Sequence, residues 1–179
     1  MTKSNRIHYV VQASIIASLY IVLTYAQGLL FPNSTSMAVQ FRVSEALTIL
    51  ALFTPSAIPG LTIGCLLANF VALGALPLDM VFGSFASLLA VLLMYKFRNI
   101  KLFNIPFLSL LMPAILNGII IGLEIEIYFI PGGFNLVSFL TQAGLVALGE
   151  LGVCFILGIP LMLVLKRTKL ATRLSKSIS

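Results

Sequence analysis

Five carboxylates are the residues whose positions most clearly imply chemistry, because all of them fall within or at the ends of long apolar segments. They are Glu45, Asp79, Glu124, Glu126 and Glu150. An ionisable side chain in a membrane-spanning helix is costly and usually faces the bundle interior, where it binds a ligand, an ion or a proton. A carboxylate deep in such a helix must be protonated or paired. The sequence therefore predicts a polar, acid-lined site inside an apolar protein.

The basic residues have the opposite distribution, since ten of the eleven lie in three short patches, within residues 3–6, 96–101 and 166–176. Between the patches the chain is almost continuously apolar, with 60% hydrophobic residues and a mean hydropathy of +1.12. Lys and Arg beside apolar spans stay on the cytosolic side of a membrane. We therefore expect both termini and the central patch in the cytosol. The net charge of +6 reflects topology and anionic lipids rather than nucleic acid, because no basic stripe alternates with aromatic residues.

The expected fold class is an all-α polytopic membrane protein with six transmembrane helices, forming one domain over residues 1–179. The expected segments cover about residues 9–28, 42–53, 60–74, 78–95, 105–129 and 136–165. The second segment is short for a span, which usually takes about 20 residues. We let it cross, because otherwise the basic loop at residues 96–101 would face outside and break the charge rule. A polar connection at residues 32–36 is expected outside the membrane.

With this topology, polar side chains gather in the outer half of the bundle. Helical spacing places Asn117 and Glu124 on one face of the fifth segment, and Cys65 and Asn69 on one face of the third. In lipid such side chains must turn inward to find partners. We therefore expect an outward-facing cavity with a net negative charge. The expected substrate-binding residues are Arg42, Glu45, Asn69, Asp79, Asn117, Glu124 and Glu150.

Structural alternatives stay open for several of these residues. Arg42 and Glu45 could form an ion pair that orients the second helix, and Asp79 could cap the fourth helix. The two asparagines could join helices by hydrogen bonds. Glu126 is interpreted as exposed at the membrane surface and is left out of the site.

Other sequence features limit the chemistry. The histidine complement is His8 alone, and Cys65 and Cys154 lie far apart in apolar segments without a CxxC motif, so we expect no metal site and no catalytic residues. A GxxxxGK[ST] loop is absent, so we expect no ATP hydrolysis by this chain. Ala13 and Ala17 are four residues apart on the first segment, a spacing that lets helices approach closely.

Several motifs resemble the queuosine-precursor transporter (QueT) family. They are RVSEAL at residues 42–47, PGLTIGC at 59–65 with AN at 68–69, DMVFGS at 79–84, NG at 117–118 and GELG at 149–152. Family members are the substrate-binding S components of energy-coupling factor (ECF) transporters, which are six-helix proteins of bacterial plasma membranes. The resemblance implies partners, namely a transmembrane scaffold protein and two cytosolic ATPases that use ATP and Mg²⁺. It also implies that the AxxxA pair, Ala13 and Ala17, faces the scaffold, and that this chain binds no cofactor.

The ligands implied by the resemblance are 7-deazaguanines: queuine, or its 7-cyano or 7-aminomethyl precursors. Carboxylates suit the N–H donors of the guanine edge and a cationic alkylamine, and an aromatic such as Phe82 could stack on the base. Two alternatives stay open. One is another vitamin-like substrate for the same architecture, and the other is a stand-alone proton-coupled carrier with Glu124 and Glu150 as the relay. A purely structural subunit is disfavoured, because buried carboxylates need a ligand or a proton.

Overall fold

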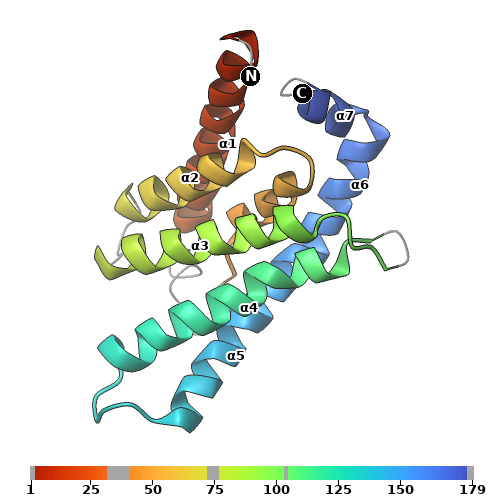
Figure 1. Cartoon of the computed structure of the whole chain (residues 1–179). Helices are drawn as coiled ribbons and strands as arrows, with labels where there is room; N and C mark the ends of the chain where they lie inside the picture. Colours follow the sequence, from red (N-terminus) through yellow and green to blue (C-terminus); the bar gives the residue numbers. More distant parts are fainter. Residues whose placement is uncertain (1–2, 32–40, 72–76, 103–104, 177–179) are drawn as a thin grey trace.

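The structure is a computed structural model that describes residues 3–31, 41–71, 77–102 and 105–176. Within these ranges the regular secondary structure consists of helices, as expected (Figure 1). The start of α1 and the last helix, α7, lie at the same end of the molecule in this view. In chain order the elements are α1 (Lys3–Leu30), η1 (Val43–Leu52), α2 (Ala57–Val71), α3 (Pro77–Phe97), α4 (Phe107–Glu124), η2 (Ile125–Phe129), α5 (Leu136–Val153), η3 (Cys154–Gly158), α6 (Ile159–Arg167) and α7 (Leu170–Lys176).

Four helical stretches are long and apolar enough to cross a membrane: Lys3–Leu30, Leu78–Phe97, Phe107–Phe129 and Leu136–Arg167. They correspond to the first, fourth, fifth and sixth expected segments. The third of these stretches ends in a π-helical turn, η2, and the fourth has one, η3, between α5 and α6. The other two expected spans correspond to the shorter apolar helices η1 and α2. The polar connection at residues 32–36 and the expected end of the third helix lie outside the described residues.

The short helix η1 occupies the middle of the protein. It contacts α1, α2, α3, α4, α5, η3 and α6, and eight consecutive residues, Ser44 to Ala51, are buried. A mainly apolar helix must be covered on most of its surface, which explains this central position. Its buried polar side chains, Ser44, Glu45 and Thr48, then need partners from neighbouring elements. Its ten residues form a 3-10 helix, which at about 2.0 Å per residue is about 20 Å long. That is less than the roughly 30 Å of a bilayer's hydrocarbon core.

Polar side chains of α1 hold both ends of η1. At the first end, the Gln27 side-chain oxygen accepts a hydrogen bond of 2.7 Å from the backbone N–H of Val43. Beyond the other end, the Gln12 side-chain oxygen accepts from the hydroxyls of Thr54 at 3.0 Å and Ser56 at 2.8 Å. Buried polar groups need such partners, so these contacts fix where η1 begins and where the chain leaves it.

Small residues bring α1 against α2. A Cβ atom added at Gly60 would lie 2.8 Å from the Ala13 carbonyl oxygen, and one added at Gly64 would lie 3.1 Å from the Ala17 Cα. Ala17 is only 8% exposed. Within the chain, therefore, Ala13 and Ala17 allow the close approach of α2, with Ala17 buried and Ala13 partly buried there.

The contact between α4 and α5 also depends on small residues. At Gly122, an added Cβ would lie 2.8 Å from the Cα of Ala143, and at Gly118 it would lie 2.9 Å from the Ala143 carbonyl oxygen. Gly144, the neighbour of Ala143, has nothing within 4 Å of the position of an added Cβ. The two helices can thus approach only where α4 carries glycine.

This contact predicts opposite effects for two glycine substitutions. Gly122→Ala is expected to destabilise the protein by about 1–3 kcal/mol, because the new methyl group overlaps backbone atoms of α5. Gly144→Ala is the matched control, and its higher helix propensity favours stability by up to about 1 kcal/mol. Thermal unfolding of the purified variants in detergent measures the difference. Equal unfolding temperatures for the two variants would contradict the packing.

Candidate functional site

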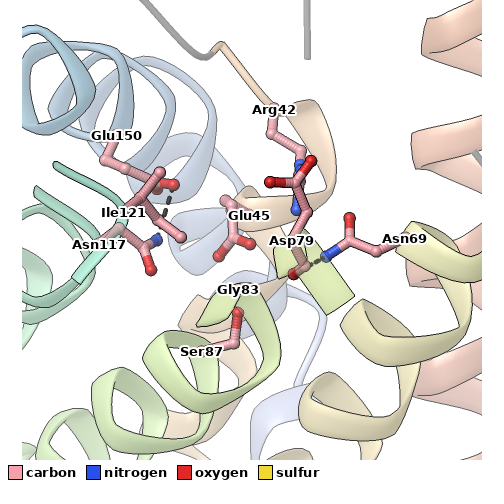
Figure 2. A pocket seen from close by; sticks show the side chains of 9 residues that line it. All are labelled: Arg42, Glu45, Asn69, Asp79, Gly83, Ser87, Asn117, Ile121 and Glu150. Carbon is pink, nitrogen blue, oxygen red and sulfur yellow. Dashed lines mark hydrogen bonds between the residues drawn. The ribbon is translucent and has the colours of Figure 1, made fainter. Parts of the chain in front are cut away.

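A small cavity lies where α2, α3, α4 and α5 approach the first turn of η1 (Figure 2). Six of the seven expected site residues line it. Five of them lie on η1, α2, α3, α4 and α5, and the sixth, Arg42, is the loop residue before η1. The lining residues are Arg42, Glu45, Asn69, Asp79, Gly83, Ser87, Asn117, Ile121 and Glu150. The seventh, Glu124, is outside this lining but lies one turn beyond Ile121 on the same face of α4.

Glu45 lies in the middle of the group, between the Asn117–Glu150 pair and the Asn69–Asp79 pair (Figure 2). It is 2% exposed, and its Oε1 accepts a hydrogen bond from the Tyr20 hydroxyl. Its Oε2 is buried and has no hydrogen-bond partner. Half of this carboxylate is therefore fixed by the protein, and half is available.

Glu150 has the same arrangement on α5. It is 5% exposed, and its Oε1 accepts a hydrogen bond of 2.8 Å from the Asn117 amide across the α4–α5 contact. Its Oε2 is buried without a partner. Asn117 thus joins two helices by a hydrogen bond, which was one of the two interpretations of this residue, and it also positions a carboxylate at the cavity.

Asn69 is fixed by its amide nitrogen. This nitrogen donates to the Asp79 backbone carbonyl at 2.8 Å, and a Cβ added at Gly83 would lie 2.9 Å from the same nitrogen. Glycine at position 83 therefore leaves the space through which Asn69 reaches α3. With its amide nitrogen used in this way, Asn69 has its carbonyl oxygen available as an acceptor.

Arg42 supplies the positive charge among the residues that line the cavity. It shares the cavity lining with Glu45, Asp79 and Glu150. One terminal nitrogen lies 3.8 Å from the Cys65 sulfur, and its Nε is buried without a partner. One guanidinium among several carboxylates leaves the site acidic.

Acceptor atoms dominate the unpaired groups of the site. Glu45 Oε2, Glu150 Oε2 and both side-chain oxygens of Glu124 are buried without a hydrogen-bond partner. An unsatisfied buried polar group costs about 1–3 kcal/mol, and a charged group costs more. The arrangement therefore suits a ligand that is rich in hydrogen-bond donors and positively charged. Within the described ranges, no three His, Cys, Asp or Glu side chains are placed to hold a metal ion.

The cavity is small in this conformation. Its volume of about 20 Å³ has room for about one water molecule. A larger ligand can enter only if the lining side chains separate. Glu45 lies on the short helix η1, and Arg42 is the loop residue directly before it. This part of the chain forms one wall of the cavity, and a larger ligand would displace it.

Glu126 differs from its interpretation as an exposed residue, because it is only 1% exposed. Its Oε1 accepts a hydrogen bond of 2.8 Å from the Asn135 backbone N–H. The chain reverses between η2 and α5 through Gly132 and Gly133, which both have positive φ, and this turn brings Asn135 back onto Glu126. The carboxylate therefore fastens the turn and does not line the cavity.

Tyr20, Gly83 and Ser87 were not predicted from the sequence as residues of the site. Tyr20 belongs to a buried stripe of α1 that continues through Thr24 and Gln27, and polar residues at such helical spacing were a usable signal. Gly83 and Ser87 follow Asp79 by four and eight residues, so they share its face of α3. Both signals were present in the sequence as helical periodicity.

Comparisons with known proteins agree with the motifs. The model of the QueT transporter family matches residues 10–167. The chain is also similar to the queuosine precursor transporter QueT of Lactococcus lactis subsp. cremoris (strain MG1363), with 34% identity over 107 residues. This similarity covers 57% of the chain and 60% of the relative, so the chain spans less than two thirds of that protein. No solved structure matches the chain.

The Tyr20–Glu45 hydrogen bond predicts a stability difference between two tyrosine variants. Tyr20→Phe leaves Glu45 Oε1 without its donor, so we expect a loss of about 1–3 kcal/mol in the free energy of unfolding. Tyr25→Phe is the control, because Tyr25 lies on the same helix and is 44% exposed. Thermal unfolding in detergent compares them, and the prediction fails if Tyr20→Phe unfolds at the temperature of the control.

Proposed function

Because the chain belongs to the QueT transporter family, we propose that it binds a queuosine precursor in the cavity beside Glu45 and Glu150 for import into the cell. The proposed ligands are 7-deazaguanines, namely queuine or its 7-cyano or 7-aminomethyl precursors. Transport by this family accounts for the absence of catalytic motifs, and a multi-pass membrane protein is consistent with the long apolar helices.

The observation that carries the proposal is the set of buried carboxylate oxygens without partners. The pyrimidine edge of a guanine-type base has two neighbouring N–H donors, which one carboxylate can accept together. Glu124 is the best candidate for this contact, because both of its oxygens lack a partner. The proposed site residues are those predicted from the sequence: Arg42, Glu45, Asn69, Asp79, Asn117, Glu124 and Glu150.

We further propose that the chain is the S component of an ECF transporter in a bacterial plasma membrane. The sequence has no phosphate-binding loop, so ATP and Mg²⁺ would be used by two partner ATPases, coupled through a transmembrane scaffold protein. The chain would form one domain that crosses the membrane six times, with η1 and α2 as short crossings and both termini in the cytosol. The basic patches support this orientation.

The scaffold contact is proposed on α1, on the side next to Ala13 and Ala17. Those two residues pack on α2, but Ser14 and Ser18 beside them are exposed. Their hydroxyls donate to backbone carbonyls of the same helix, at 3.0 Å and 2.9 Å, so they need no other polar partner. Small, internally satisfied side chains allow a partner helix to approach closely.

The binding proposal is tested by isothermal titration of the purified chain with queuine and its two precursors. Glu124→Gln keeps the shape of the side chain but removes its charge. Loss of a charged hydrogen bond of about 1.5–3 kcal/mol corresponds to a roughly 10- to 150-fold loss of affinity. Glu126→Gln is the matched control, since Glu126 is equally buried but fastens a turn. Absence of binding by all three compounds would remove the substrate assignment.

The coupling proposal predicts that binding and uptake separate. Ser18→Trp should abolish uptake in cells and weaken co-purification with the ATPase module, while the isolated variant still binds its ligand. Leu19→Trp is the control, because Leu19 is 46% exposed and lies about 100° around the helix from Ser18. Normal uptake by Ser18→Trp would place the contact elsewhere. Uptake that stops with an uncoupler while ATP is constant would favour a proton-coupled carrier.

A further inference from the structure

Two half-paired carboxylates, Glu45 and Glu150, line the same cavity from different elements. Each has one oxygen held by a protein donor, the Tyr20 hydroxyl for Glu45 and the Asn117 amide for Glu150. Each also has a second oxygen that is buried and without a hydrogen-bond partner. Figure 2 shows Glu45 in the centre of the cavity wall, with Glu150 and Asn117 to one side. The site thus presents two single acceptors rather than one complete carboxylate.

The two carboxylates line the same cavity, so they repel each other when both are charged. Like charges repel, and burial strengthens the repulsion because the surroundings screen it poorly. The donors from Tyr20 and Asn117 fix the orientation of the two groups but bring no positive charge. Arg42 lines the same cavity and supplies one positive charge, while Glu45, Asp79 and Glu150 supply three carboxylates. A second cation between the free oxygens of Glu45 and Glu150 would offset the remaining negative charge and satisfy both acceptors.

The chemistry of the two free oxygens selects the kind of cation. A protonated amine has N–H donors directed to different sides and a full positive charge, so it can donate to both carboxylates at once. A nitrile has no donor and turns an acceptor nitrogen toward the two acceptors. The metal alternative lacks support, because within the described ranges no set of three ligating side chains is placed for it.

We propose that Glu45 and Glu150 form an ammonium site that makes the protein select amine-bearing 7-deazaguanines over the 7-cyano compound. This inference rests on the proposed function, because it takes the base as given and concerns the substituent at its 7-position. Tyr20 and Asn117 are positioning residues in this site, since they hold one oxygen of each carboxylate and leave the other for the ligand. Glu124, whose two oxygens are both unpaired, is then left for the donor edge of the base.

The first experiment needs no substitution in the protein. Isothermal titration of the full chain in detergent compares 7-aminomethyl-7-deazaguanine with 7-cyano-7-deazaguanine and with neutral 7-hydroxymethyl-7-deazaguanine, which has nearly the size of the amine. Loss of a charged hydrogen bond corresponds to about a 10- to 150-fold change in affinity, so we expect the amine to bind at least about 10-fold more tightly than either neutral compound. Equal affinities for the three compounds would overturn the ammonium site.

The second experiment assigns the preference to the two carboxylates. In Glu45→Gln and in Glu150→Gln, affinity for the amine should fall by about 10- to 150-fold. Affinity for the 7-cyano compound should hold or rise, because the new amide group can donate to the nitrile, so that the selectivity is lost. Binding of the 7-cyano compound also shows that the variant is folded. Glu126→Gln, the buried acid outside the cavity, should keep the selectivity of the unmodified protein. An equal loss for both compounds would mean that the carboxylates serve the base or the fold, and would overturn the proposal.

The outcomes separate this proposal from the function on which it rests. If the 7-cyano and 7-aminomethyl compounds bind equally well, the proposed function stands and the ammonium site fails. If neither compound nor queuine binds to the unmodified protein, the proposed function fails, and the ammonium site fails with it. Selectivity for the amine that disappears in Glu45→Gln and Glu150→Gln supports both.

Discussion

The need to satisfy buried carboxylates in apolar surroundings governs the centre of this protein. Neither lipid nor a core of Leu, Ile and Ala side chains can replace water around Glu45 or Glu150, so each must find donors from another element. Tyr20 on α1 and Asn117 on α4 supply one donor each. These hydrogen bonds connect elements that are distant in the sequence, and they leave unpaired oxygens at one common place. The same two carboxylates, Glu45 and Glu150, therefore hold elements of the fold together and offer acceptors to a ligand.

Close helix packing makes this arrangement possible. Gly60 and Gly64 allow α2 to approach α1, and Gly118 and Gly122 allow α4 to approach α5. The short side chain of Asn117 can then reach Glu150 on α5, and Gly83 leaves the corresponding space for Asn69 to reach α3. A bundle with larger residues at these contacts would hold the same polar groups too far apart to pair. The small residues therefore determine the geometry of the site without touching a ligand themselves.

The sequence predicted the long helices well and the site only in outline. Apolar length and basic flanks located the helices around Asp79, Glu124 and Glu150, because these signals depend on single segments. Tyr20 and Gly83 were not predicted, because helical periodicity shows which face of a helix they share but not which helix lies opposite that face. Glu126 was misread for a similar reason, since the turn that buries it returns from beyond η2. The 3-10 geometry of η1 has no periodic signature in ten residues of which eight are buried.

Because η1 is a 3-10 helix, its length differs from that of an α-helix with the same number of residues. The same ten residues would extend about 15 Å as an α-helix instead of about 20 Å, and each residue would turn through about 100° instead of about 120°. A shift in hydrogen-bond register would therefore rotate Glu45 and draw the two ends of the helix together by several ångströms. One end borders the cavity, and the chain beyond the other end is tied to Gln12 through Thr54 and Ser56. The cavity and the chain that Gln12 holds therefore lie at the two ends of one short helix, whose length depends on its hydrogen-bond register.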